Sequence, residues 1–381
     1  MKATTMLTLA AVLLAAALLP APAAEPAPAK APRARHIDLA ICLDTSNSMD
    51  GLIASAKQKL WAVVNELATA RPRPVLRVAL YQYGNNGLDR EVGWVQRVCD
   101  LTDDLDTVYG KLFALTTNGG TEYVARVVRA AADELKWDEG TNALRIIFVA
   151  GNEPATQDPK HKLQEVCAAT ASKGIIINTI FCGSERTGQR TGWADAARWA
   201  DGRYAAIDAD RGTVVVATPY DKKLAELGRK LNATYVAYGA AGKGGRANQT
   251  AQDANAARLG APAVAERAAA KATALYRNAR WDLVDAVSDK QIDPGEVPEK
   301  ELPEAMRKMT PDQRREYVKA KAAEREKIQK EIAALNARRE AYVKKEMSRK
   351  GLSEGEAFDA AIRSAVREQA REKAFDFEAG K

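Results

Sequence analysis

The stretch Ile37-Asp38-Leu39-Ala40-Ile41-Cys42-Leu43 is mostly apolar, and Asp44-Thr45-Ser46-Asn47-Ser48 follows it directly. A short apolar run that ends in polar turn residues is typical of a buried parallel strand. Asp44, Ser46 and Ser48 therefore place a carboxylate and two hydroxyls at the carboxyl end of this strand. Hard oxygen ligands of this kind suit Mg²⁺. The same residue types also form ordinary turns and helix caps, so the neighbouring sequence has to decide between the two interpretations.

The chain around this stretch has the pattern of an α/β protein. Apolar strand-like runs alternate with amphipathic stretches up to residue 238, which predicts an open, doubly wound sheet covered by helices on both faces. The second and third strands are joined by too few residues for a crossover helix, so they should pair antiparallel, while the other strands are parallel. The expected strands are 37–43, 76–83, 93–100, 144–150, 175–182 and 204–207.

A second loop supports the interpretation of the first stretch as a binding site. Asn118-Gly119-Gly120-Thr121 opens a helix, and its glycines allow the backbone to come close to a bound ion. Together with the D-x-S-x-S residues and the antiparallel strand, this loop resembles the von Willebrand factor type A (VWA) domain, and the resemblance covers residues 36–239. It implies a Rossmann-like, mostly parallel six-stranded sheet with one antiparallel edge-side strand.

The resemblance also implies a metal site. The metal-ion-dependent adhesion site of VWA domains binds a divalent cation and, through it, an acidic group of a partner. The matching positions in this chain are Asp44, Ser46 and Ser48 in the first loop and Thr121 in the second. The implied cofactor is Mg²⁺ or Mn²⁺. A bare helix cap is the alternative interpretation of Thr121.

The third loop of the site departs from the family pattern. The family has T-D-G after the fourth strand, whereas this chain has Ala150-Gly151-Asn152-Glu153-Pro154, so Gly151 stands where the aspartate is expected. Because affinity for a hard cation depends on the charge of its ligands, this loss predicts weaker metal binding. Asn152 offers a neutral oxygen, and Glu153 is long enough to reach the ion or its water. An exposed Glu153 without a role is an equal alternative.

The beginning of the chain predicts export. Residues 1–24 combine a positive start, a short apolar stretch and a small-residue cleavage region, which are the features of a signal peptide. The apolar stretch is shorter than the roughly 20 residues that span a bilayer, so no integral membrane span is expected after cleavage. Residues 25–35 follow as a Pro/Ala-rich tether. The third loop and the segments 217–221 and 231–239 resemble an exported bacterial type of VWA protein, which favours the periplasm or the cell surface.

The sequence after residue 239 predicts two further regions. Residues 240–260 are rich in glycine and predict a flexible linker. Lys243 is followed by Gly244 and no strand precedes it, so this segment lacks the spacing of a phosphate-binding loop. Residues 261–381 are rich in Ala, Lys, Arg and Glu, and they predict a charged helical region that adds a second contact with a partner.

Capping boxes and a thin apolar seam describe the helices of this last region. The capping boxes are Thr310-Pro311-Asp312-Gln313 and Ser353-Glu354-Gly355-Glu356. Charged residues interrupt the seam, which favours a solvated helix or a helical hairpin over a strong coiled coil. The apolar members of the seam are Val318, Ile328, Ile332, Leu335 and Tyr342, and its interruptions are Arg325, Arg339 and Glu346.

The charge and the cysteines of the chain reduce the number of functions that the sequence allows. The 381-residue chain has a formal charge of +7, but charged residues of both signs make up 28% of it, as in an ordinary solvated exterior. No basic run contains interleaved aromatic residues, which argues against a nucleic-acid partner. The scattered cysteines predict buried free thiols, with one disulfide left open by export. The cysteines are Cys42, Cys99, Cys167 and Cys182.

These features favour an exported, non-enzymatic binding module that recognises a protein or a cell-envelope ligand through the cation. Because of Gly151, the main alternative is a metal-independent scaffold that interacts through its helical tail. A Ser-His hydrolase is disfavoured, because His36 precedes the first strand and His161 opens a helix, and neither is placed like a triad histidine. A carboxylate-based hydrolase is the remaining alternative. The oligomeric state follows from none of these patterns.

Overall fold

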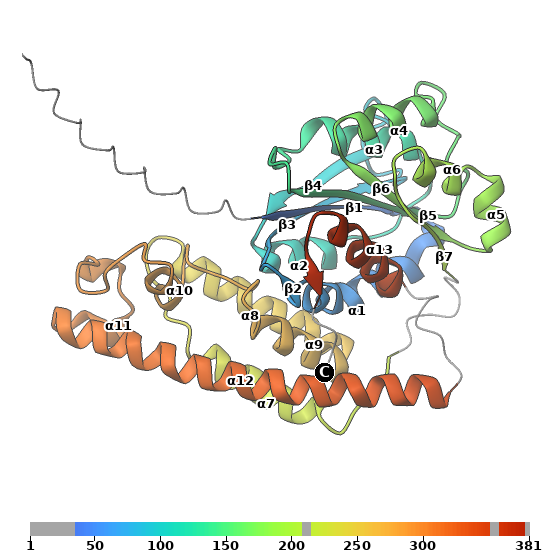
Figure 1. Cartoon of the computed structure of the whole chain (residues 1–381). Coiled ribbons are helices and arrows are strands. Elements are labelled where there is room, and N and C mark those ends of the chain that lie inside the picture. Colours follow the sequence, from blue (N-terminus) through green and yellow to red (C-terminus); the bar gives the residue numbers. More distant parts are fainter. Residues whose placement is uncertain (1–34, 208–214, 351–357, 378–381) are drawn as a thin grey trace, which may run out of the picture. The chain divides into compact units, whose positions relative to one another are not determined.

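The apolar runs of the sequence form a six-stranded sheet in the computed structural model, which describes residues 35–207, 215–350 and 358–377. The strand order is β4-β3-β1-β5-β6-β7, and every neighbouring pair is parallel except β3 and β4. The predicted mostly parallel sheet with one antiparallel strand is thus confirmed (Figure 1). The strands are β1 (His36–Asp44), β3 (Val75–Tyr83), β4 (Val95–Thr102), β5 (Leu144–Gly151), β6 (Ile176–Cys182) and β7 (Tyr204–Ile207).

Several predicted features lie outside the described residues. They are the signal peptide, all of the tether except Arg35, and the capping box at 353–356. None of the helices in the described part of the chain is long and apolar enough to cross a membrane.

Helices cover both faces of the sheet, as buried parallel strands require. One face packs against α1 (Asp50–Leu67) and α2 (Leu105–Phe113). The other face packs against α3 (Val124–Glu134), α4 (Leu163–Ser172) and α6 (Trp193–Arg198), while α5 (Glu185–Arg190) lies beside β7. Both faces of β1 are therefore buried, and its end at Asp44 lies in the interior of the protein.

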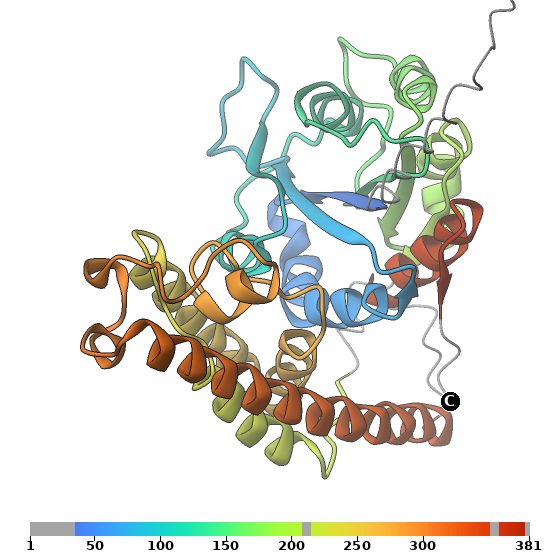
Figure 2. The ribbon, with the colours of Figure 1, turned by 60° about the vertical axis from the view of Figure 1, so that its left-hand side comes forward.

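The last helix of the chain completes the first face. Helix α13 (Phe358–Glu372) packs on α1 and against β5 and β6 (Figures 1 and 2). The buried Gln369 amide exchanges two hydrogen bonds with the Asn178 amide of β6, at 2.9 and 2.7 Å. After α13, β8 (Asp376–Phe377) pairs with β2 (Ala70–Arg71) beyond the end of α1. The sheet domain is thus built from two separate parts of the sequence.

This arrangement differs from the expected domain order, in which the sheet domain ended near residue 239. The buried side chains of α13 repeat at the spacing of one helix face, which explains how it covers the sheet. They are Ile362, Ala365, Val366, Gln369 and Ala370. Because these residues include two alanines and a glutamine, the apolar pattern of this helix face is weak in the sequence, although the face is buried in the fold.

Residues 215–350, which lie between β7 and α13 in the sequence, form a helical insertion. Its helices are α7 (Asp221–Asn232), α8 (Gly242–Leu259), α9 (Ala261–Lys271), α10 (Leu283–Ser288), α11 (Glu304–Arg307) and α12 (Pro311–Arg349). The glycine-rich segment 240–260 was expected to be a flexible linker, but it forms α8. Gly245 has a packing role there, because a Cβ atom at this position would lie 2.3 Å from the Trp281 ring.

Helix α12 begins at the predicted capping box, in which Thr310 and Gln313 exchange side-chain to backbone hydrogen bonds. The apolar seam of this helix is more continuous than expected, because Arg325 and Arg339, which were expected to interrupt it, are buried. Arg325 donates to Asp282 Oδ2 at 2.7 Å and to Asp285 Oδ1 at 3.0 Å. Arg339 donates to Asp221 Oδ1 at 2.9 Å. The predicted solvated helix therefore docks on the rest of the insertion through one face.

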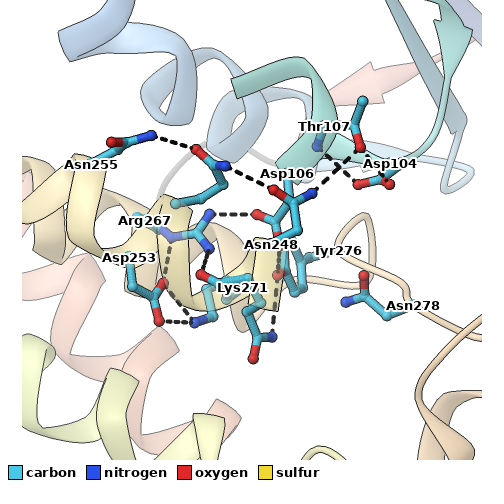
Figure 3. Close-up of polar contacts among 12 residues, drawn as sticks. Asp104, Asp106, Thr107, Asn248, Asp253, Asn255, Arg267, Lys271, Tyr276 and Asn278 are labelled. Atoms are coloured by element: carbon cyan, nitrogen blue, oxygen red, sulfur yellow. Dashed lines mark hydrogen bonds and ion pairs between the residues drawn. The ribbon is translucent and has the colours of Figure 1, made fainter. Parts of the chain in front are cut away.

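A buried polar network ties the insertion to the sheet domain (Figure 3). Arg267 of α9 donates to Asp106 Oδ1 of α2 at 2.7 Å and to Asp253 Oδ1 of α8 at 2.5 Å. The Tyr276 hydroxyl also donates to Asp106. Lys271 completes the network by donating to Asp253, and burial followed by repulsion from Arg267 lowers its pKa to about 8.

The predicted free thiols are confirmed, since all four cysteines are free and three of them are buried. Burial raises the pKa of the Cys42, Cys167 and Cys182 thiols, which keeps them protonated and unreactive.

Replacement of Asp106 by alanine should lower the free energy of unfolding by about 1–3 kcal/mol, because it removes one of the two aspartates that pair with buried Arg267 and the acceptor of the Tyr276 hydroxyl. Urea unfolding followed by circular dichroism measures this loss. The control is Asp103→Ala, which removes an exposed ion pair with Arg280 and should cost less than about 1 kcal/mol. Equal losses in the two variants would contradict a structural role for the network.

Replacement of Ile362 by alanine should cost about 2–5 kcal/mol, because this side chain is 1% exposed between α13 and the sheet domain. Ser364→Ala on the exposed side of the same helix is the matched control. If both substitutions leave the urea midpoint unchanged, α13 does not cover the sheet in solution.

Candidate metal centre

The first loop of the candidate site follows β1 without interruption. Asp44 is fully buried, and its Oδ1 atom accepts a hydrogen bond of 2.8 Å from the Ser46 backbone. The Ser46 and Ser48 hydroxyls lie 3.1 Å apart. The i, i+2, i+4 spacing therefore gathers the carboxylate and both hydroxyls at one end of the sheet.

Two further loops are tied to the first by backbone hydrogen bonds. The Asn47 N–H donates to the Gly119 carbonyl at 2.8 Å, and the Asn118 N–H donates to the Thr45 carbonyl at 3.0 Å. The loop after β3 joins them, because the Asn86 N–H donates to the Asn118 carbonyl at 3.0 Å. Gly119 has a φ of 56°, which favours glycine, and a Cβ atom there would overlap the Asn86 amide.

The loop after β5 reaches the first loop through Asn152. The Ser48 hydroxyl donates to Asn152 Oδ1 at 3.3 Å, so this neutral oxygen lies beside the predicted ligands. The Glu153 side chain is exposed, while its carbonyl accepts a 2.8 Å hydrogen bond from Trp193 Nε1.

Gly151 has no room for the aspartate of the family pattern. A Cβ atom at this position would lie 2.5 Å from the Tyr83 hydroxyl oxygen and 3.1 Å from Asp44 Oδ2. The Tyr83 hydroxyl donates to the Ala150 carbonyl at 3.0 Å, so the ring is held in this place. The tyrosine thus fills the space beside Asp44 from which a carboxylate on the third loop would project.

Thr121 is half-buried between two residues that contact the site, Gly120 and Glu122. Within the described residues its hydroxyl makes no hydrogen bond to the other predicted ligands. Asp44, Ser46, Ser48 and Asn152 are therefore joined by direct contacts, whereas Thr121 belongs to the same loop cluster by its backbone position.

Glu122 is a site residue that the sequence reasoning missed. Its side chain is only 9% exposed, and it extends over Gly120 toward Ser46 and over Gly84 toward Asp44. The available signal was its place in the chain, directly after Thr121 in a loop already assigned to the site.

The carboxylates of the site are crowded and only partly compensated. Burial raises the pKa of Asp44 to about 7, and the charges of Glu122 and Glu153 contribute to the rise, while hydrogen bonds from Ser46 oppose it. Burial also raises the pKa of Glu122, with a further contribution from Glu153. Asp44 Oδ2 is buried and has no hydrogen-bond partner among the described residues. A bound cation would offset the repulsion between the carboxylates and would give the unpaired Asp44 Oδ2 atom a partner.

The donor set fits a hard divalent cation, because it consists of carboxylate, hydroxyl and amide oxygens. In the described residues, no group of three or more His, Cys, Asp or Glu side chains is arranged to hold a metal ion. A site of the predicted kind does not need such a group, since hydroxyls and waters supply most of its ligands.

The pKa of Asp44 predicts a pH dependence of stability in metal-free buffer. Between pH 3.8 and about 7 the folded state holds a proton that the unfolded state has released, so the free energy of unfolding falls as the pH rises through this window. Asp44→Asn removes this contribution. Urea unfolding in EDTA should show that the free energy of unfolding of the variant rises relative to that of the wild type from pH 4 to pH 8. The rise should reach about 1.4 kcal/mol for each unit by which folding raises the pKa of Asp44. A pH-independent difference would contradict the assignment.

Comparisons with solved structures show low similarity over about half of the chain. The conserved hypothetical protein BatB from Bacteroides thetaiotaomicron is 17% identical with a TM-score of 0.36, and the match covers 45% of this chain and 90% of that one. The SpRpn10 VWA domain is 18% identical with a TM-score of 0.36, with 48% and 100% covered. The pilus adhesin SpaC from Lactobacillus rhamnosus GG is 13% identical with a TM-score of 0.36, with 47% and 28% covered.

No curated protein matches the chain. Residues 39–153 match the family model of the von Willebrand factor type A domain, and this range includes the first two loops of the site and Asn152. The order of the strands agrees with the fold expected for that family. Residues 39–153 of this chain are therefore identified as a von Willebrand factor type A domain.

Proposed function

We propose that this protein is a non-enzymatic binding module that recognises a protein or cell-envelope ligand through a divalent cation. Asp44, Ser46, Ser48 and Thr121 would hold the ion, and Asn152 would add a neutral oxygen from the third loop. Glu153, at the exposed side, would contact the ion or its water. The bound ion would present a free coordination position to an acidic group of the partner.

One observation carries this proposal more than any other. Asp44 Oδ2 is completely buried and unpartnered within the described residues, at the point where the loops after β1, β3 and β5 meet. An unpaired buried carboxylate oxygen costs free energy, so its position at a family metal site favours occupation by a cation. Mg²⁺ and Mn²⁺ both suit the oxygen ligands.

We further propose that the protein is exported and acts in the periplasm or at the cell surface. This location rests on the sequence of residues 1–24, which lie outside the described residues, and on the tether that follows. A nucleic-acid partner is not proposed.

The geometry gives less support to a hydrolase. His36 is the first residue of β1 and lies 3.8 Å from Asp138, whereas Asp44 is the last residue of the same strand. His161 is half-buried and contacts Arg129. Neither histidine is placed to serve the carboxylates and serines of the site as a base.

A metal-independent scaffold is the second candidate. The observation that favours it is the filling of the Gly151 position by Tyr83, which removes the usual place of a second carboxylate. In that case the exposed side of the helical insertion would carry the interaction.

Calorimetric titration of Mg²⁺ and Mn²⁺ into the whole purified chain should show saturable binding with one site. Asp44→Ala and Ser46→Ala should each abolish it, because they remove the central carboxylate and a neighbouring hydroxyl. Ser172→Ala is the matched control on the exposed part of α4 and should bind as the wild type does. Absence of binding up to millimolar ion would favour the scaffold function instead.

A further inference from the structure

The second carboxylate of the VWA metal site is missing from the β5 loop, and the structure shows another carboxylate close to Asp44. From its geometry we infer that Glu122, on the loop before α3, serves as the second acidic ligand of the cation in this protein. The inference rests on the proposed function, since it concerns the same ion.

Two glycines create the space that Glu122 occupies. A Cβ atom on Gly120 would lie 2.1 Å from Glu122 Oε1, and a Cβ atom on Gly84 would lie 2.8 Å from Glu122 Cγ. Any other residue at either position would displace the glutamate. Gly84 also has a φ of 76°, which disfavours other residues.

The same glycines show which groups the glutamate faces. The Cβ position on Gly84, which lies 2.8 Å from Glu122 Cγ, is only 2.7 Å from Asp44 Oδ1. The Cβ position on Gly120, which lies 2.1 Å from Glu122 Oε1, is 3.1 Å from Ser46 Cβ. The Glu122 side chain therefore lies beside both Asp44 and Ser46 of the first loop.

The Gln157 amide also holds Glu122 in place. Gln157 Nε2 donates to the Glu122 carbonyl at 2.9 Å and lies 3.4 Å from its Oε2 atom. Oε1 is thus the oxygen on the side of Ser46, while Gln157 orients Oε2. An orienting hydrogen bond to a ligand carboxylate is a usual feature of metal sites.

An acidic cluster alone would not establish a ligand, but Asp44 adds an independent observation. It is fully buried, and its Oδ2 atom has no hydrogen-bond partner among the described residues. A cation would stabilise a buried carboxylate of this kind with a second carboxylate nearby. Gly151 lies beside Asp44 Oδ2, whereas Glu122 approaches from the Oδ1 side, so the glutamate would supply the second acidic ligand from a different loop than the family pattern does.

Mn²⁺ binding to the whole chain tests this inference, with the loss of the free-ion signal in electron paramagnetic resonance as the readout. Glu122→Gln should weaken binding by about tenfold or more, as changes at ligand positions and their partners generally do. Glu165→Gln is the matched control, because it removes an exposed carboxylate on α4 that lies outside the site, and it should change the dissociation constant by less than about threefold.

Gly120→Ala provides a second test that leaves Glu122 in the sequence. Its methyl group should move the carboxylate away from the site and weaken Mn²⁺ binding like Glu122→Gln, and the double variant should be no weaker than either single one. Circular dichroism and thermal unfolding would show that each variant folds.

The possible outcomes separate the inference from the function on which it rests. Wild-type binding that Glu122→Gln leaves unchanged, or weakens no more than Glu165→Gln does, would overturn the role of Glu122 while the metal-dependent function stands. No Mn²⁺ binding by the wild type up to millimolar ion would overturn both.

Discussion

A parallel sheet has to be covered on both faces, and in this protein the last cover comes from the far end of the chain. Without α13, the buried residues of α1, β5 and β6 that it contacts would face water. The chain therefore has to return to the sheet after building the whole helical insertion. Within the described residues, the elements that form and cover the sheet are therefore discontinuous in sequence although they belong to one compact unit.

Buried charge pairs help to position the insertion, together with its apolar clusters. Arg267, Arg325 and Arg339 are all buried, and each one meets at least one aspartate from another element. Buried ion pairs of this kind add little net stability compared with apolar residues, but they disfavour alternative packings strongly, because a displaced arginine would lose its partner. The Arg267 to Asp106 pair has a particular consequence, since it fixes α9 of the insertion against α2 of the sheet domain.

The sequence predicted the sheet well because its strands are long apolar runs with one short connection. It also predicted that Asp44, Ser46, Ser48 and Asn152 would converge, since the ends of neighbouring parallel strands meet at one edge. The covering role of α13 was harder to predict, because its stripe contains alanines and a glutamine. Helix α8 was missed because glycine was interpreted as flexibility, whereas Gly245 accommodates an indole ring.

The site shows the same limit of sequence reasoning. Gly151 indicated a lost carboxylate, but only the structure shows that Tyr83 fills its place and that Glu122 approaches Asp44 through the space left by two glycines. The most direct test is anomalous diffraction from crystals of the whole chain grown with Mn²⁺. We expect one strong anomalous peak within bonding distance of Asp44 and Glu122, beside the Ser46 and Ser48 hydroxyls. A peak elsewhere, or none at saturating Mn²⁺, would contradict metal binding at this site.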